Sequence, residues 1–284
     1  NYSPATLTAN TWFKRVVTSG ACSADTSAAI AVTVNQLVAG NTITGTQTIC
    51  AGNAPTQFVG ATPTGGNGTY TYTWLSSTTS ATAGFAVIGS SNTISYTAGA
   101  LTANTWFKRV VTSGPCANDT SSAIAVTTNS AIAANTIAGA QSICSGATPA
   151  ALTGSTPTGG TGTFTYSWLV SSTSATSGYT VATGTNNTAN YAPASLTATR
   201  WYKRLVISGA CSDSSAAVQI TVNPTLANNT VSSAQTVCSG SAPSALTGTT
   251  PTGGNSTYTY LWQRSTTSAS TGYSAAPGTN NAIG

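Results

Sequence analysis

The chain has 284 residues, of which 40% are hydrophobic and only 4% are charged, and its formal net charge is +5. It contains eight Lys and Arg residues, three Asp, no Glu and no His. Without His or Glu it lacks the side chains of a Ser-His-Asp relay, a His-based metal site or a carboxylate-rich calcium loop. Three dispersed Asp residues do not supply a catalytic carboxylate pair. We therefore expect no enzyme activity, no metal site and no cofactor.

Charge and hydropathy also argue against several partners. Disordered chains combine low hydrophobicity with high net charge, and this sequence shows neither. Five net charges without a Lys/Arg run make a weak field, so we expect no nucleic-acid binding. No stretch approaches the roughly 20 apolar residues of a membrane span. The first residues do not form a signal peptide, and we expect any export signal to lie outside this sequence.

The sequence repeats itself with a period of about 94 residues. The segment LTANTWFKRVVTSG occurs at residues 7–20 and again, unchanged, at 101–114, and LTATRWYKRLVISG follows at 196–209. A second block, TPTGGNGTYTYTW in its first copy, recurs with the same period. A unit of this length can hold its own core, so the sequence predicts an array of small domains.

Strands of the type AIAVTVN mark the ends of successive units. Boundaries placed after them predict a partial domain at 1–35, complete domains at 36–129 and 130–223, and another partial domain at 224–284. The first segment carries only the last strands of a unit, and the last segment lacks those strands. Two explanations stay open: a window of a longer protein, which we prefer, or a subunit completed by strands of a neighbour.

Each unit is predicted to be all strand. Short β-branched or aromatic runs alternate with turn signals rich in Gly, Pro and Asn. In the first complete unit, the expected strands include residues 70–74, 85–88, 93–96, 106–112 and 122–128. Roughly seven short strands with a Trp on a central strand predict an immunoglobulin-like β-sandwich, with a barrel of similar strand count as the alternative. The expected fold class is all-β, with tandem immunoglobulin-like domains in an extended array.

Six cysteines without metal-like spacing predict disulfides and an oxidising, extracellular setting, with six buried thiols as the alternative. One set opens each domain and the other lies in the hairpin before the last strand: Cys50, Cys144 and Cys238, then Cys22, Cys116 and Cys211. We expect the first strand to begin at the pole that carries this hairpin. That placement predicts the pairs Cys50–Cys116 and Cys144–Cys211, with the partners of Cys22 and Cys238 outside the chain. A Cys22–Cys50 pair is disfavoured, because the last strand would separate its members by about 30 Å.

Basic residues recur at one place in each period, where Lys and Arg are adjacent, as in Lys14-Arg15, Lys108-Arg109 and Lys203-Arg204. Neighbouring residues of a strand point to opposite faces. We expect one side chain of each pair to be a solvated charge. The other is expected to lie over core atoms or to bond a loop carbonyl. The alternative is a periodic basic patch that binds acidic glycans or lipopolysaccharide.

A Trp precedes each of these pairs and is itself followed by Phe or Tyr, so one ring of the two is expected to face outward. The candidate ligand-facing residues are Trp12, Lys14, Trp106, Lys108, Trp201 and Lys203. A second set, Trp74, Trp168 and Trp262, alternates in phase with other rings and is expected in the core. The triplets Asn67-Gly68-Thr69 and Asn118-Asp119-Thr120 fit the acceptor pattern for N-linked glycans.

The ordered blocks TPTGGxGxYTYxW, LTxxTWFKRVVTSGxC, a strand ending in VTVN, and QTICxG resemble the immunoglobulin-like repeats of giant Bacteroidota cell-surface adhesins. These are SprB-like gliding-motility adhesins exported by type IX secretion. The resemblance spans all three periods and implies a disulfide-stiffened filament on the bacterial cell surface, without catalysis. It implies surface glycans or other cell-surface polymers, and further copies of the repeat, as partners. The sequence lacks the C-terminal sorting domain of such proteins, and a carbohydrate-binding repeat array is the alternative function.

Overall fold

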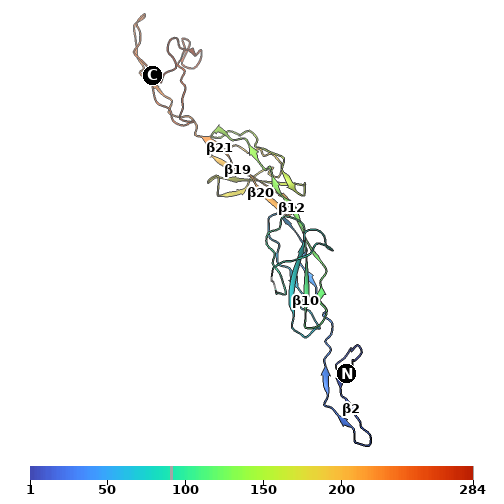
Figure 1. The fold of residues 1–284 in the computed structure, drawn as a ribbon. Helices are drawn as coiled ribbons and strands as arrows, with labels where there is room; N and C mark the ends of the chain where they lie inside the picture. The colour runs from blue at the N-terminus through green and yellow to red at the C-terminus, as the bar shows by residue number, and fades with distance from the viewer. Residues whose placement is uncertain (90–91, 284) are drawn as a thin grey trace. The chain divides into compact units, whose positions relative to one another are not determined.

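The computed structural model describes residues 1–89 and 92–283 (Figure 1). These residues form strands, bridges, turns and bends, and no helix occurs among them. The all-β prediction is therefore confirmed. The chain divides into two compact units, Asn1–Ala131 and Ile132–Gly284.

The first unit opens with four short strands in the N-terminal segment, residues 1–35. They are β1 (Thr11–Phe13), β2 (Val16–Val17), β3 (Asp25–Thr26) and β4 (Ile30–Val32). β1 pairs antiparallel with β4, and β2 pairs antiparallel with β3. Most of their side chains are exposed. This segment contains strands without a core of its own.

The rest of the first unit, residues 36–131, is called the first module here and is built around a large sheet. Its central strands β8 (Thr71–Ser77) and β10 (Thr105–Thr112) pair antiparallel, with Trp74 opposite Arg109. β9 (Ala86–Val87) flanks β8, and β11 (Asp119–Thr120) pairs with β10. β12 (Ile124–Ala133) pairs antiparallel with β10, while β6 (Gln47–Cys50) runs parallel to β12.

A smaller layer packs against this sheet in the first module. β5 (Ile43–Thr44) and β7 (Val59–Gly60) pair antiparallel, and Phe58 forms an isolated bridge with Tyr96. The buried cluster between the layers contains Ile43, Phe58, Trp74, Phe107, Ile124 and Val126. The rings of Phe58 and Phe107 lie 4.5 Å apart. Two layers around one core confirm the immunoglobulin-like sandwich and not the barrel.

Most of the predicted strands of the first module occur in the structure. Residues 70–74, 106–112 and 122–128 correspond to β8, β10 and β12, and the run 85–88 shortens to β9. The described residues 93–96 form no regular strand, so that prediction is wrong. The carbonyl of Thr93 accepts a hydrogen bond from the Trp74 indole, and that of Ile94 accepts one from Arg109. At Thr93 and Ile94, side chains therefore supply the hydrogen bonds that the backbone of a neighbouring strand would otherwise supply.

The second unit begins at Ile132, and its part up to Asn223, the second module, repeats this arrangement around its own core. Its strands are β13 (Ile137–Ala138), β14 (Gln141–Cys144), β15 (Thr153–Gly154), β16 (Thr158–Gly160), β17 (Thr165–Ser171), β18 (Tyr179–Val181), β19 (Arg200–Ser208), β20 (Cys211–Ser214) and β21 (Val218–Asn223). β17 and β19 pair antiparallel with Trp168 opposite Arg204, and β14 runs parallel to β21. Leu152, Trp168, Tyr191, Tyr202 and Ile220 are buried together.

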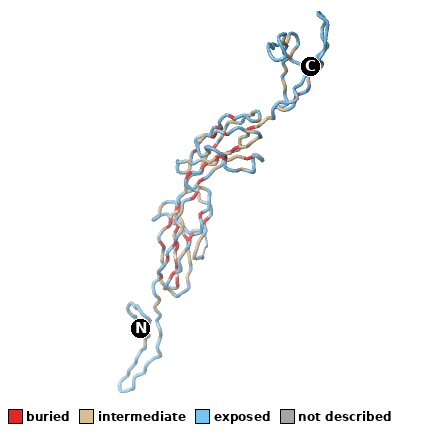
Figure 2. The backbone as a smooth tube through the Cα atoms, turned by 180° about the vertical axis from the view of Figure 1, so that it is seen from behind, coloured by how far each residue is buried: buried red, intermediate tan, exposed pale blue. Residues whose placement is uncertain are grey.

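The C-terminal segment, residues 224–284, contains only short strand pairs. These are β22 (Val231–Ser232) with β23 (Thr247–Gly248), and β24 (Gln263–Arg264) with β25 (Ser274–Ala275). Buried residues gather in the two modules and not in this segment (Figure 2). Trp262 was predicted in a core but is only half-buried, whereas Trp74 and Trp168 are fully buried. The reason is that this segment has no equivalent of β10 and β12 to cover the ring.

The predicted disulfide pairs Cys50–Cys116 and Cys144–Cys211 are wrong, because Cys116 and Cys144 carry free thiols. The disulfide-bonded cysteines are Cys50 and Cys211. Cys22 and Cys238 are also free thiols, and their pairing outside the chain stays a prediction.

The direction of β6 explains the error. Because β6 runs parallel to β12, Cys50 lies opposite Asn129, near the end of the last strand. Cys116 lies in the turn between β10 and β11, before β12 begins, and its Sγ contacts the carbonyl of Gln36 at 3.5 Å. The two cysteines of the first module therefore lie at opposite ends of the sandwich, too far apart for a disulfide.

Candidate functional site

The central strand β10 separates its side chains between the core and an outer face. Phe107, Arg109 and Val111 are buried, whereas Trp106 and Lys108 are half-buried on the other side. This alternation is that of a strand with one face on a core. The prediction that adjacent Lys and Arg side chains point to opposite faces is confirmed in this module, and the outward ring of the Trp-Phe pair is the Trp.

The outer face of the first module consists of Trp106, Lys108, Leu75, Phe85 and Val87. Lys108 lies opposite Leu75 on β8, and Leu75 lies opposite Val87 on β9. The Lys108 Nζ lies 4.5 Å from the centroid of the Phe85 ring, a cation–π distance. Val87 is exposed. The surface is thus apolar and aromatic with one ammonium group.

The second module carries an equivalent outer face, formed by Trp201, Lys203, Leu169, Tyr179 and Val181. The Lys203 Nζ lies 4.7 Å from the centroid of the Tyr179 ring. Sequence reasoning identified the Trp and Lys of both faces but missed the rings under the Lys side chains. The signal was present, because an aromatic residue recurs with the repeat at Phe85, Tyr179 and Tyr273.

In the N-terminal segment the candidate residues do not form such a face. Trp12 lies on β1 and is exposed, and Lys14 follows β1 and is also exposed. β1 pairs with β4 in a two-stranded sheet, so it has no strand beside it that corresponds to β8. Trp12 and Lys14 are therefore not brought together with a Phe85-like ring.

On the opposite side of the sheet, Arg109 is a buried cation with a complete set of acceptors. Its Nε donates to Asn41 Oδ1 at 2.8 Å, and its Nη1 donates to the Ile94 carbonyl at 2.7 Å. Its Nη2 donates to the Ala61 carbonyl at 2.7 Å. Its guanidinium carbon lies 5.1 Å from the centroid of the Tyr72 ring. The guanidinium ties together segments that are distant in sequence.

Arg204 occupies the same position in the second module. Its Nε donates to Asn135 Oδ1 at 3.0 Å, its Nη1 to the Ala189 carbonyl at 3.0 Å and its Nη2 to the Ser155 carbonyl at 2.8 Å. Its guanidinium carbon lies 5.1 Å from the Tyr166 ring centroid. The same contacts in both modules identify this arginine as part of the repeat's internal structure.

Burial shapes the electrostatics of these arginines. Loss of solvent lowers the pKa of Arg109, while Tyr72 and Asp119 act in the opposite direction. Burial likewise lowers the pKa of Arg204, and Tyr166 opposes it. A buried charge is tolerated only when its hydrogen bonds are made, and the carbonyl and amide acceptors meet that need. The arginines therefore serve the module's interior.

The outer faces offer stacking, apolar contact and one cation each, which suits binding. Within residues 1–89 and 92–283, no three His, Cys, Asp or Glu side chains form a group that could hold a metal ion. The described part of the chain also has no helix capable of spanning a membrane.

Several solved structures are similar to this chain at low sequence identity. An E-to-A variant of titin domains I67–I69 is 11% identical with a TM-score of 0.35, and the match covers 66% of this chain and 65% of titin's. Murine CEACAM1b is 11% identical, with a TM-score of 0.28 and coverage of 65% and 99%. Extracellular domains 3–5 of Drosophila OTK are 10% identical, with a TM-score of 0.30 and coverage of 74% and 69%. The chain thus spans just under two thirds of the titin fragment.

Among curated proteins, nothing matches the chain. A protein-family model does match it, in three successive stretches: residues 1–36, 39–130 and 133–224.

Proposed function

The chain belongs to the family described as "Domain of unknown function (DUF8696)", and we propose that it is a non-catalytic repeat segment of a long extracellular adhesin. In this proposal the modules act as a stalk that projects and spaces adhesive parts. The predicted domains, 36–129 and 130–223 with partial domains at 1–35 and 224–284, are its building units. Three successive family matches support a repeated unit as the working element.

The observation that carries the proposal is the repeated, self-sufficient interior of the modules. Each module buries its own Trp and its own arginine, and each arginine is bonded to acceptors within its own module. Such a unit folds without help from a ligand or a cofactor and can be copied many times along a chain. The family matches are separated by only two residues, and short linkers restrict bending between neighbouring domains.

Composition and chemistry support the extracellular part of the proposal. Disulfides persist in oxidising environments, and Cys50 and Cys211 are disulfide-bonded. Placement on a bacterial cell surface, a role in gliding motility and export by type IX secretion rest on the resemblance of the sequence blocks. Many copies of one module would give multivalent adhesion from individually weak contacts.

Single-molecule stretching of the chain between its two ends, under conditions that reduce the disulfide-bonded Cys50 and Cys211, tests the spacer role. Two separate unfolding events are expected, each releasing about 300 Å for a domain of this length, because each module has its own core. An Arg109→Met variant should lower the force of one event and leave the other unchanged. A single cooperative event, or extension without a resolved event, would overturn the proposal.

A second candidate function is carbohydrate binding, favoured by the outer faces. Each face places a Trp on the same side of the strand as a Lys, with a second ring within 5 Å of the ammonium. Aromatic rings offer apolar surface with specific geometry, and the ammonium adds hydrogen-bond donors for hydroxyl or acidic groups.

Glycan-array binding of the intact chain distinguishes this function from a passive stalk. Binding that disappears in the Trp106→Ala, Trp201→Ala double variant would support it. Leu37→Ala is the matched control, because Leu37 is an exposed apolar residue that is not part of either outer face. Absence of binding, or equal binding by all variants, would contradict carbohydrate recognition at these faces.

A further inference from the structure

The lysines of the two outer faces carry charges that no protein group neutralises. Lys108 Nζ lies 4.5 Å from the Phe85 ring centroid, and Lys203 Nζ lies 4.7 Å from that of Tyr179. Within the part of the chain that the structure describes, neither ammonium forms an ion pair or donates a hydrogen bond. Because an ammonium has three N–H donors, each outer face presents donors that are available to a ligand.

The carboxylates of the two modules lie on the opposite side of the sheet. The sequence has no Glu and only three Asp, of which the modules contain Asp119 and Asp213. Asp119 lies directly opposite Val111, and Asp213 lies directly opposite Val206. Both valines are buried on the core side, and directly opposed side chains of an antiparallel pair share a face. Among the described residues, each outer face therefore carries one positive charge and no negative charge.

The Trp of each outer face lies next to this charge. Trp106 and Lys108 are two residues apart on β10, as are Trp201 and Lys203 on β19, and all four side chains are half-buried. Two residues of a strand span about 6.6 Å, which is comparable with one pyranose ring. An indole supplies a flat apolar surface. A sugar ring that lies on the Trp can therefore bring a substituent at its edge to the ammonium.

The contact between ammonium and ring is kept in both modules although the ring itself differs. Phe85 lies beside Lys108, and Tyr179 lies beside Lys203. The Tyr179 hydroxyl donates a hydrogen bond to the Ala175 carbonyl at 3.1 Å, so it is directed at its own loop. A cation–π contact restrains the long Lys side chain before a ligand arrives. This restraint reduces the side-chain freedom that binding would remove.

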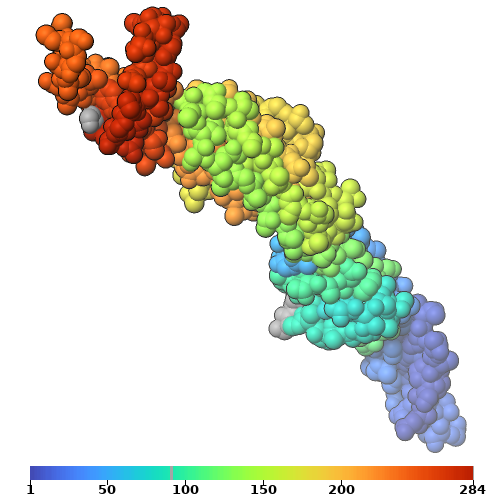
Figure 3. All heavy atoms as spheres, turned by 90° about the horizontal axis from the view of Figure 1, so that it is seen from above, coloured from blue at the N-terminus to red at the C-terminus, as the bar shows by residue number. Residues whose placement is uncertain are grey.

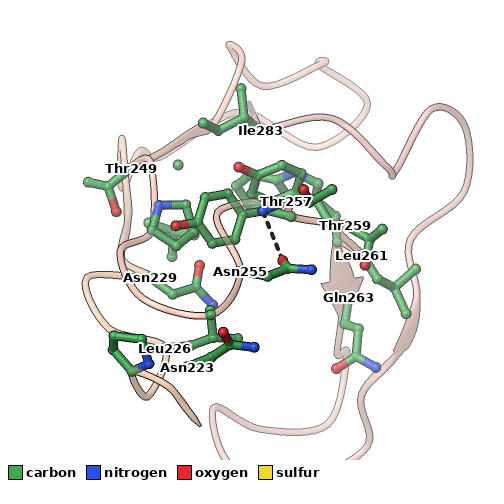
Figure 4. A pocket seen from close by; sticks show the side chains of 18 of the residues that line it. Asn223, Leu226, Asn229, Thr249, Asn255, Thr257, Thr259, Leu261, Gln263 and Ile283 are labelled. Atoms are coloured by element: carbon green, nitrogen blue, oxygen red, sulfur yellow. Dashed lines mark hydrogen bonds between the residues drawn. The ribbon is translucent and has the colours of Figure 1, made fainter. Parts of the chain in front are cut away.

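The C-terminal segment contains a cavity of about 880 Å³, which is another place where a ligand could lie. In the space-filling view this segment divides into two lobes with a hollow between them (Figure 3). Asn229, Thr257 and Gln263 are among the described residues that line the cavity, and none of these lining residues is a Lys, Arg or Asp (Figure 4). The cavity therefore lacks the charge that the outer faces present.

We propose that each outer face binds a hexuronate unit of an acidic polysaccharide, with the apolar side of the sugar ring on the Trp and the carboxylate paired with the Lys. This inference rests on the carbohydrate-binding function proposed above and names its ligand class. Trp106 and Trp201 bind the sugar ring, whereas Lys108 and Lys203 select a charged sugar over a neutral one.

A carboxylate fits this face better than a phosphate group. The carboxylate of a hexuronate is bonded directly to a ring carbon and carries one negative charge, which matches a single ammonium. Phosphate sites commonly use Arg forks or several backbone N–H groups, and Arg109, the one Arg of β10, is buried on the other side of the sheet. A single exposed ion pair is weak, so a polymer that offers many hexuronate units suits a repeated face.

Isothermal titration calorimetry of the full chain with oligomers of galacturonate, mannuronate and glucuronate tests the role of the charge. Each oligomer is compared with its methyl ester, which keeps the sugar ring and masks the carboxylate. We expect at least one acidic oligomer to bind about three- to tenfold more tightly than its ester. This preference should shrink as the salt concentration rises, because salt screens exposed charges.

Variants of the two lysines test whether they provide the selectivity. The Lys108→Gln, Lys203→Gln double variant should bind acid and ester equally and leave the affinity for the ester unchanged, whereas Lys108→Arg, Lys203→Arg should keep the preference for the acid. Lys14→Gln, Arg15→Gln is the matched control. It also removes two positive charges, but from exposed residues that do not form an outer face, so it should keep the preference.

The outcomes separate this inference from the function on which it rests. Equal binding of acids and esters would overturn hexuronate selection, and carbohydrate binding at these faces would still stand if that binding disappeared in Trp106→Ala, Trp201→Ala. Binding of neither form would overturn both. A preference for the acid that persists in Lys108→Gln, Lys203→Gln, or that the control variant loses equally, would also overturn the inference. A sulfated galactan oligomer that binds as tightly as the best hexuronate would overturn the choice of a carboxylate.

Discussion

The same fourteen residues, LTANTWFKRVVTSG, adopt different structures at 7–20 and at 101–114. At 101–114 they form the unbroken strand β10, whereas at 7–20 they form the short strands β1 and β2, interrupted at Lys14 and Arg15. β10 lies between β8 and β12 in its sheet, but β1 has β4 alone as a neighbour. Because the local sequences are identical, the difference comes from neighbouring strands and not from intrinsic propensity.

The burial of the inward-facing side chains changes with this context. Phe107, Arg109 and Val111 are buried, while Arg15 and Val17 in the other copy are exposed. A strand therefore gains its length and order from the apolar and polar groups that it can bury against partners. Substitutions at matched positions of the two copies separate the effect of context from the effect of sequence.

Among the matched substitutions, those of Arg109 and Arg15 should differ most in their effect on the stability of the first module. Arg109→Met leaves the Asn41, Ile94 and Ala61 acceptors unpaired inside the first module and should destabilise it by about 3–5 kcal/mol. Arg15→Met should change the stability of that module by less than about 0.5 kcal/mol. Hydrogen exchange of the β10 amides measures both. Equal effects of the two substitutions would show that the buried contacts do not stabilise the module.

The glycine that makes room for this arginine should give the next largest effect. A Cβ on Gly60 would lie 1.9 Å from Arg109 Nη1 and 2.0 Å from the Ile94 carbonyl, so Gly60→Ala should cost about 3 kcal/mol. Gly99→Ala is the matched control, because no atom lies within 4 Å of its Cβ position. Chemical denaturation followed at the first module compares the two. A Gly60→Ala variant as stable as Gly99→Ala would contradict the packing around the guanidinium.

The sequence was sufficient to predict the features that depend on short-range pattern. Alternation predicted that Lys108 and Arg109 point apart, and the in-phase rings predicted a core position for Trp74. It could not predict that Asn41, 68 residues away from Arg109, would meet its guanidinium. That contact depends on how two layers of the sandwich come together, and no local pattern encodes it.

The cysteines show the same limit more sharply. The sequence showed that the cysteines recur with the repeat. Their pairing could not be predicted without knowing whether the strand that carries Cys50 runs parallel or antiparallel to the last strand of the module. β6 runs parallel to β12, so Cys50 lies at the far end of the module from Cys116. Whether two strands pair parallel or antiparallel is a property of sheet topology. If β6 ran in the opposite direction, Cys50 would lie at the other end of the module, near Cys116.

Among apolar side chains, a moderate difference in stability is expected between substitutions of Val111 and Val17, which occupy the same position in the two copies. Val111→Ala removes two methyl groups from a fully buried position and should cost the first module about 2 kcal/mol. Val17→Ala, at the same place in the identical sequence, should lower the free energy of unfolding by less than about 0.5 kcal/mol at low protein concentration. Urea denaturation gives both values. If Val17→Ala were equally costly in dilute solution, residues 1–35 would already be packed in a core within one chain.

The smallest effect concerns alkaline pH and compares the two modules directly. Burial raises the pKa of Tyr202 to about 12, with Tyr191 adding to the shift and Arg200 opposing it; the first module has Phe107 at this position. Between pH 10.0, the ordinary tyrosine pKa, and about pH 12, the Tyr202 hydroxyl loses its proton in the unfolded state but keeps it in the folded state. The free energy of unfolding of the second module therefore falls as the pH rises through this range. Tyr202→Phe should reduce that fall in the second module, and Phe107→Tyr should introduce it in the first. Urea midpoints at pH values below and above 10 measure the slopes, and slopes unaffected by either exchange would show that the buried hydroxyl does not control alkaline stability.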